Sequence, residues 1–140
     1  MRVVLVALAA LGAALVGRSM ASSCVRRARV LRQAMDALQV LRLQMLERRL
    51  PLHAALSASR FEALRLAGER MAAGADAKTA WEQTWRTLSR RGGALDCLAR
   101  EDAEALSTLF GALGAGTRLE QEALFASALR ELGRLESEAA

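Results

Sequence analysis

The chain has 140 residues, 20 lysines and arginines against 15 aspartates and glutamates, and a formal net charge of +5. Ala, Leu, Arg and Glu dominate, tyrosine is absent and proline occurs once, which favours helix nearly everywhere and leaves little material for strands. We therefore predict an all-α protein in which residues 26–140 form one small domain. The positive charge is concentrated before Asp76, whereas the chain after it is acidic.

The N-terminal segment is an apolar run from Val3 to Val25, interrupted by Arg18. As a helix rising ~1.5 Å per residue it spans ~35 Å, enough for the ~30 Å hydrocarbon core if Arg18 extends its guanidinium towards the head groups. Most basic residues follow the run, so the positive-inside rule places the downstream chain in the cytosol. We predict a membrane anchor at residues 1–25, with these side chains in lipid or at the head groups: Val3, Leu5, Leu8, Leu11, Leu15, Arg18, Arg26, Arg27, Arg29 and Arg32.

A cleaved signal peptide is the alternative interpretation of this segment. The unbroken part, Val3 to Gly17, spans only ~22 Å as a helix, which is the length of a signal-peptide apolar region. Ser19-Met20-Ala21 follows it and fits a small-x-small cleavage site. The chain would then be an exported helical adaptor.

From Val30 to Leu50 the apolar residues recur at intervals of three and four, which predicts a helix. One stripe consists of Leu31, Met35, Leu38, Leu41 and Met45, and a second of Val40, Leu43, Leu46 and Leu50. With two apolar stripes, we expect this helix to be covered on more than one side. No helix breaker separates it from the anchor, and Pro51 is expected to end it.

The second predicted helix runs from about Leu52 to Ala73 and buries Leu56, Phe61, Leu64 and Met71. Gly74 is its expected C-terminal cap. Asp76 is the expected N-cap of a third helix, although Thr79 to Glu82 also fits a capping box that would shift the start by one turn. On that helix Trp81, Trp85 and Leu88 share a face. We expect both tryptophans in the core, against the Leu31 to Leu50 helix, rather than on a ligand platform or at the membrane interface.

Arg90-Arg91-Gly92-Gly93 predicts a connecting loop, because a phosphate-binding loop would need a preceding strand and a Gly-Lys-Ser/Thr end. A fourth helix begins between Leu95 and Asp102 and reaches Leu113, with acidic residues in its first turns as the helix dipole favours. After Gly114, Thr117 and Glu120 fit a capping box for a last helix to about Ser137. The residues expected to be buried on that helix are Leu119, Phe125, Leu129, Leu132 and Leu135.

No arrangement of residues predicts chemistry. His53 is the single histidine, and Cys24 and Cys97 are far apart without a CxxC motif. We expect no catalytic residue, metal, cofactor or small-molecule substrate. Nucleic acid is also not expected as a partner, because no aromatic residue lies among the arginines to stack on bases, and anionic lipid is the expected counter-charge at ~1 kcal/mol per residue.

Three blocks occur in order behind the anchor: Leu31 to Gln39 running on to Pro51-Leu52, then Ala80-Trp81-Glu82, then Leu113-Gly114 with Gln121. Together they resemble the stage III sporulation protein AB family. The residues that carry the resemblance are Leu38, Pro51, Leu52, Trp81, Glu82, Leu113, Gly114, Thr117 and Gln121, with Thr117 standing where the family usually has Asp. The segment between Leu56 and Phe61 is shorter than in the family. The family's second transmembrane helix has no counterpart here, through truncation or loss in this lineage.

The resemblance implies a non-enzymatic membrane component of the channel apparatus that links mother cell and forespore during endospore formation. Its domain, of about five helices, would lie in the mother-cell cytosol and be similar to the cytoplasmic domain of the type II secretion platform protein. The implied partners are a secretion-type ATPase, similar to stage III sporulation protein AA, and other channel proteins. The candidate partner surface is Glu101, Asp102, Glu104, Glu120 and Glu122, and an ordinary solvated face is the alternative.

Overall fold

A computed structural model of the chain describes residues 1–139, except for the side chains of residues 19–21. The cleavage motif considered at Ser19, Met20 and Ala21 therefore lies outside the described side chains. The helices are α1 (Arg2–Arg42), the π-helical segment η1 (Leu43–Glu47), α2 (Leu52–Ser57), α3 (Glu62–Ala72), α4 (Ala77–Leu88), α5 (Arg100–Ala112) and α6 (Arg118–Ala139). Within the described residues no strand occurs, and an apolar helix opens the chain, as predicted.

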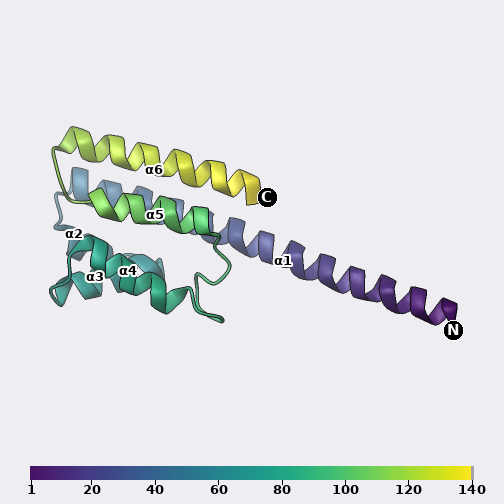
Figure 1. Ribbon diagram of the computed structural model, residues 1–140. Coiled ribbons are helices and arrows are strands. Elements are labelled where there is room, and N and C mark those ends of the chain that lie inside the picture. Colours follow the sequence, from purple (N-terminus) through teal and green to yellow (C-terminus); the bar gives the residue numbers. More distant parts are fainter. Residues whose placement is uncertain (140) are drawn as a thin grey trace.

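Helix α1 has two halves with different surroundings. Its C-terminal half lies in the bundle, where α6 packs along it, and its N-terminal half projects from the bundle without a break (Figure 1). The projecting half is long and apolar enough to cross a membrane, and its most apolar window has a mean hydropathy of 2.0 and is 0% buried. The predicted lipid-facing side chains Val3, Leu5, Leu8, Leu11 and Leu15 are all at least 60% exposed.

The end of α1 precedes Pro51 by several residues. The π-helical segment closes with a bond from Arg48 N to Leu43 O of 3.2 Å, and Arg49 then adopts a φ of 54°. Pro51 is the N-cap of α2. Proline therefore begins the next helix, while the chain turns at Arg49, two residues before it.

The prediction of one helix from Leu52 to Ala73 is wrong, because α2 and α3 are separate helices that pack against each other. Ser57 Oγ donates to His53 O at 2.8 Å, and Ser59 Oγ accepts from Phe61 N at 3.2 Å. Ser59 thereby takes up the N–H of Phe61, which a continuous helix would have bonded to Ser57 O, at the start of α3. Gly68 permits the close packing, since a Cβ there would lie 2.5 Å from Ser57 N.

Helix α4 begins at Ala77, with Asp76 as its N-cap accepting from Thr79 N at 2.8 Å, so the start does not shift to Thr79. Trp81 is buried and stacks on Phe110 with ring centroids 4.7 Å apart. Trp85 is only partly buried. Helix α4 packs mainly on α3 and α5, and Trp81 lies in the same core cluster as Leu38 and Leu41, with Trp85 packed against that cluster.

The turn between α5 and α6 forms as predicted. Gly114 has a φ of +83°, Glu120 N donates to Thr117 Oγ1 at 3.2 Å and Thr117 N donates to Glu120 Oε2 at 3.3 Å, which completes the capping box. Leu119, expected in the core, is instead 76% exposed. At 100° per residue it lies on the opposite side of α6 from the buried Leu132.

The second apolar stripe of α1 is largely uncovered, contrary to the prediction. In the second stripe Val40 is 52% and Leu43 50% exposed, and Leu46 is buried. In the first stripe Leu38 and Leu41 are buried. Helix α6 covers one side of α1, and the apolar residues on the other side face a groove beside the turn between α2 and α3.

Gly68→Ala is expected to destabilise the protein by about 1–3 kcal/mol, because its Cβ has to displace the backbone of α2. Gly111→Ala is the matched control, since a Cβ there has no neighbour within 4 Å. In that exposed helical position alanine should stabilise by about 0.5–1 kcal/mol. Thermal unfolding of the detergent-solubilised chain measures both, and equal shifts in Tm would contradict the close packing at Gly68.

Candidate functional site at the junction of α1, α5 and α6

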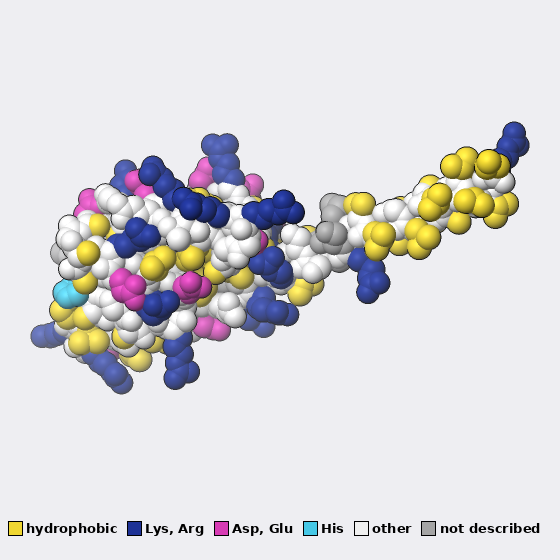
Figure 2. Space-filling model, turned by 90° about the horizontal axis from the view of Figure 1, so that it is seen from below, with side chains coloured by type: hydrophobic (Ala, Val, Ile, Leu, Met, Phe, Trp, Pro, Cys, Tyr) yellow, Lys and Arg dark blue, Asp and Glu magenta, His cyan; other side chains and the backbone are white. Residues whose placement is uncertain are grey.

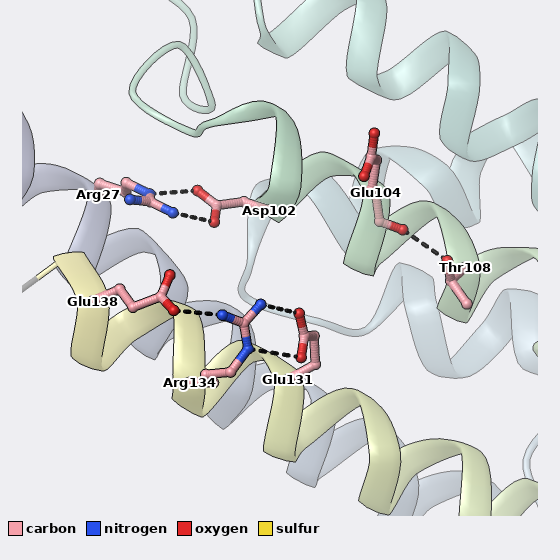
Figure 3. A network of polar contacts seen from close by, with 7 residues as sticks. All are labelled: Arg27, Asp102, Glu104, Thr108, Glu131, Arg134 and Glu138. Carbon is pink, nitrogen blue, oxygen red and sulfur yellow. Dashed lines mark hydrogen bonds and ion pairs between the residues drawn. The ribbon is translucent and has the colours of Figure 1, made fainter.

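A bidentate ion pair joins α1 to the start of α5. Arg27 Nε donates to Asp102 Oδ2 and Arg27 Nη2 to Asp102 Oδ1, both at 2.7 Å (Figure 3). The side chain of Asp102 is 0% exposed and that of Arg27 20%. Oδ2 of Asp102 also accepts from Ala99 N at 2.8 Å, so the same carboxylate caps the first turn of α5. Hydrogen bonding to Asp102 raises the pKa of Arg27, which stays charged.

This pair corrects two predictions. Asp102 is buried and cannot contribute to a partner surface. The guanidinium of Arg27 binds Asp102 instead of lipid head groups. A planar guanidinium matches a carboxylate in two parallel bonds, which makes this pairing favourable in a partly buried position.

Two further arginines of the predicted head-group set also bind acidic residues of the domain. Arg26 Nη2 lies 2.6 Å from Asp96 Oδ1, and Arg32 Nε lies 3.1 Å from Glu136 Oε1 on α6. Asp96 also accepts from Gly92 N at 3.1 Å, which connects the loop between α4 and α5 to α1. Among the described residues, Arg18 and Arg29 are exposed and form no ion pair.

The contacts of Asp96 with Arg26 and Gly92 are expected to depend on pH. Hydrogen bonds from Arg26 and Gly92 hold the pKa of Asp96 below its ordinary value. Because the pKa in the folded protein is below that of the unfolded chain, this contribution to stability is complete above the unfolded pKa and is lost as pH falls through the folded one.

Asp102→Asn is expected to cost about 2–4 kcal/mol, because Arg27 then keeps a mostly buried charge without a counter-charge, while a fifth of its side chain remains in water. Asparagine preserves the cap acceptor, so the loss reports the ion pair. Glu101→Gln, an exposed neighbour on the same turn, is the control and should stay within about 0.5 kcal/mol of the original. Chemical denaturation measures both, and an equally small effect of Asp102→Asn would refute the role of the pair.

A surface groove of about 390 Å³ lies between α5 and α6 and is rimmed by acidic side chains. Glu101 and Glu104 lie on its α5 side and Glu131 on its α6 side. Arg134 binds Glu131 at 2.6 Å and also binds Glu138 (Figure 3). Hydrogen bonding to Arg134 lowers the pKa of Glu131. Glu101 and Glu104, which pairs with Arg100 at 3.1 Å, are exposed and flank a groove whose floor is formed by Ala105, Leu109, Leu124 and Ala128.

The acidic residues predicted as one partner surface do not form one. Glu120 caps α6 through Thr117, and Glu122 lies 3.4 Å from Arg118, which also reaches Glu47. Since α5 and α6 run in opposite directions (Figure 1), Glu120 and Glu122 lie at the other end of this helix pair, about 12–17 Å from Glu104 and Glu101 along the helices. The sequence alone could not place the two ends relative to each other. Glu131 lies at the same groove as Glu101 and Glu104.

Several of the residues that carry the family resemblance, among them Leu52, Gly114 and Gln121, meet around the turn between α5 and α6. Gly114 N donates to Gln121 Oε1 at 3.0 Å, and Gln121 Nε2 donates to Ala112 O at 3.2 Å and to Ala115 O. A Cβ at Gly114 would lie 3.1 Å from Leu52 Cδ2. The buried glutamine thus holds a turn that also packs on the start of α2, a role that the sequence analysis did not assign to it.

Three of the other motif residues lie in the core. Leu38 and Leu113 are buried, Trp81 stacks on Phe110, and Glu82 is exposed. In the described part of the chain, no group of three His, Cys, Asp or Glu side chains could hold a metal ion. His53 and Cys24 are exposed, and burial raises the pKa of the Cys97 thiol.

The family model for stage III sporulation protein AB (spore_III_AB) matches residues 2–140. The chain belongs to the stage III sporulation protein AB family. A solved structure of a "Stage III sporulation protein AB (SpoIIIAB)" is similar to it with a TM-score of 0.67 and 27% sequence identity, covering 83% of this chain and 94% of that one. No curated protein sequence matches at a significant level.

The predicted family is therefore confirmed, and so is the helical architecture behind an apolar N-terminal helix. Membership identifies a sporulation protein. In this member of the stage III sporulation protein AB family, the motif residues Gly114 and Gln121 hold the turn between α5 and α6, and three of the arginines that follow the apolar half of α1 bind acids of the domain.

Proposed function

We propose that this chain is a non-enzymatic, membrane-anchored component of the channel between mother cell and forespore, with its helical domain serving as a platform for a secretion-type ATPase. One observation carries the anchoring. The apolar half of α1 has no partner within the described chain and continues without a break into the helix against which the bundle packs. We assign residues 1–25 to the membrane and 26–140 to a domain in the mother-cell cytosol.

The platform role rests on family membership and on the kind of surface that the domain offers. Its conspicuous surface feature is a groove rimmed by acidic side chains, which suits protein contact. We infer that the domain is similar in role to the cytoplasmic domain of the type II secretion platform protein, and that the ATPase resembles stage III sporulation protein AA. Other channel proteins would assemble beside it.

The partner surface that we propose is the acidic groove, defined by Glu101, Glu104 and Glu131. Glu101 and Glu104 are exposed at its rim, and apolar side chains line the floor between them and α6. Acidic rims favour a partner with a basic surface and act mainly on the association rate. This surface replaces the five-residue set, of which Asp102 is buried and Glu120 and Glu122 lie at the other end of α6.

Glu101→Lys with Glu104→Lys should slow association of the detergent-solubilised chain with the ATPase encoded beside it by about tenfold or more at low salt, because charge steers encounter. The difference should largely vanish at 0.5 M NaCl, where the Debye length falls to about 4 Å. Glu120→Lys with Glu122→Lys carries the same charge change at the other end and is the control. If both double variants slow association equally, the groove is not the docking surface, and if the unmodified chain does not associate, the platform role is wrong.

An exported adaptor is the second candidate, because removal of residues 1–21 would leave all the ion pairs from Arg26, Arg27 and Arg32 in place. We expect the intact N-terminus instead. Mass spectrometry of the protein purified from its own membranes distinguishes the two, since a mature chain beginning at Ser22 would establish cleavage.

A further inference from the structure

The loop Arg90-Arg91-Gly92-Gly93 has no part in the proposed platform, yet it has a defined position. We propose that Arg90 and Arg91, together with Arg29 and the exposed part of Arg26, form a membrane-facing basic surface that binds anionic lipid head groups and holds the end of the domain on the bilayer. This inference rests on the proposed anchoring by α1. It gives a function to a loop that the sequence presents only as a connector.

Internal contacts hold the loop in shape. Gly93 N donates to Arg90 O at 2.7 Å, and Leu95 N donates to Leu88 O at 2.9 Å. Gly92 has a φ of +85°, and a Cβ at Gly93 would overlap Leu88 O. Both glycines are thus required by the loop conformation. Arg90 and Arg91 are exposed on this loop.

The loop is attached to α1 at the first turn of the domain. Asp96 accepts from Gly92 N at 3.1 Å and pairs with Arg26 at 2.6 Å, so one carboxylate binds both the loop and the helix. Figure 1 shows the loop before α5 and the C-terminal end of α6 at the end of the bundle from which the N-terminal half of α1 emerges. The pair between Arg32 and Glu136 places α6 at this level.

The length of α1 sets the distance of this end from the bilayer. A helix from Val3 to Val25 spans ~35 Å, slightly more than the ~30 Å hydrocarbon core, so Arg26 falls at the head groups. No spacer separates the apolar half of α1 from the bundle, because the contacts of the domain begin at Arg26 and Arg27. The loop fastened to Arg26 therefore lies at head-group level.

The charge at this end is complementary to anionic lipid. Figure 2 shows Lys and Arg side chains gathered where the helix leaves the domain. The acids near this end are held by arginines, namely Asp96 by Arg26, Asp102 by Arg27, Glu136 by Arg32, and Glu131 and Glu138 by Arg134. Glu101 is exposed and outside these pairs, whereas Arg29, Arg90 and Arg91 form no ion pair within the described chain. The surplus of exposed charge is positive.

Limited trypsin digestion of the full chain in vesicles tests the proposal. The protein is reconstituted into phosphatidylcholine vesicles and into vesicles with 30% phosphatidylglycerol, and flotation verifies insertion. Cleavage after Arg90 or Arg91 is compared with cleavage after Arg48 or Arg49, which are exposed in the turn at the opposite end of the domain. Taking the ratio within each sample cancels differences in orientation and in trypsin concentration near the surface.

We expect phosphatidylglycerol to slow cleavage at Arg90 and Arg91 by at least about fivefold relative to Arg48 and Arg49, the factor contributed by one basic residue at an anionic surface. The protection should disappear in 0.5 M NaCl. Equal ratios in the two kinds of vesicle would overturn the lipid-binding surface while leaving the anchor intact. Failure to float would overturn the anchoring and this surface with it.

A charge variant supplies an independent measurement. With Cys24→Ser and Cys97→Ser as background, a fluorophore on Ser89→Cys reports contact with nitroxide-labelled lipid in the anionic vesicles. Arg90→Gln with Arg91→Gln should lower the apparent affinity of the loop for anionic lipid, as measured by this quenching, at least about fivefold. Arg48→Gln with Arg49→Gln should leave the quenching unchanged. Unchanged quenching in the loop variant would overturn the role of the two arginines.

Discussion

Helix α1 joins an uncovered apolar half and a packed half in one continuous backbone, and most of the architecture follows from that constraint. Over its first half the side chains are apolar on every side, and nothing in the described chain covers them. Over its second half the buried residues Leu31, Leu38 and Leu41 form one stripe, against which α6 packs. Since a helix is stiff over this length, the bundle inherits its position from the apolar half, and no linker allows it to move away.

The charged residues around this helix form three groups. At the junction, Arg26, Arg27 and Arg32 are directed to acids on three different elements, which fixes the loop, α5 and α6 relative to α1. Arg29, Arg90 and Arg91 at this end are exposed. Glu101 and Glu104 lie on the side of the groove between α5 and α6. If both proposals hold, the lipid contacts and the protein contacts of the domain lie on separate surfaces.

The family motif acts through packing and backbone capping. Gln121 satisfies carbonyl groups at the end of α5 and accepts from Gly114 N, and Leu52 lies against the same glycine. Residues that are distant in the sequence thereby share one structural task, which is to set the angle between the last two helices. Helix α6, which begins at this turn, is also the main packing partner of α1.

Local patterns in the sequence determined much of this protein. Its helical class, the apolar N-terminal helix, the Asp76 cap and the capping box from Thr117 to Glu120 all depend on residues within a few positions of one another. The family could be identified for the same reason, since its motifs are short. Where local signals were weak, at Ser57 and Ser59, the prediction of one continuous helix was wrong.

Only the tertiary structure decided which charges meet. Arg27 and Asp102 are 75 positions apart, and each by itself has the features of a surface residue, so periodicity could not show that they pair in the interior. The same holds for Arg26 with Asp96, and for Glu101 and Glu131 across one groove. Helix patterns give the direction of a side chain relative to its own axis, whereas the facing partner depends on how helices distant in sequence pack, and burial then decides whether a charge serves the fold or a partner.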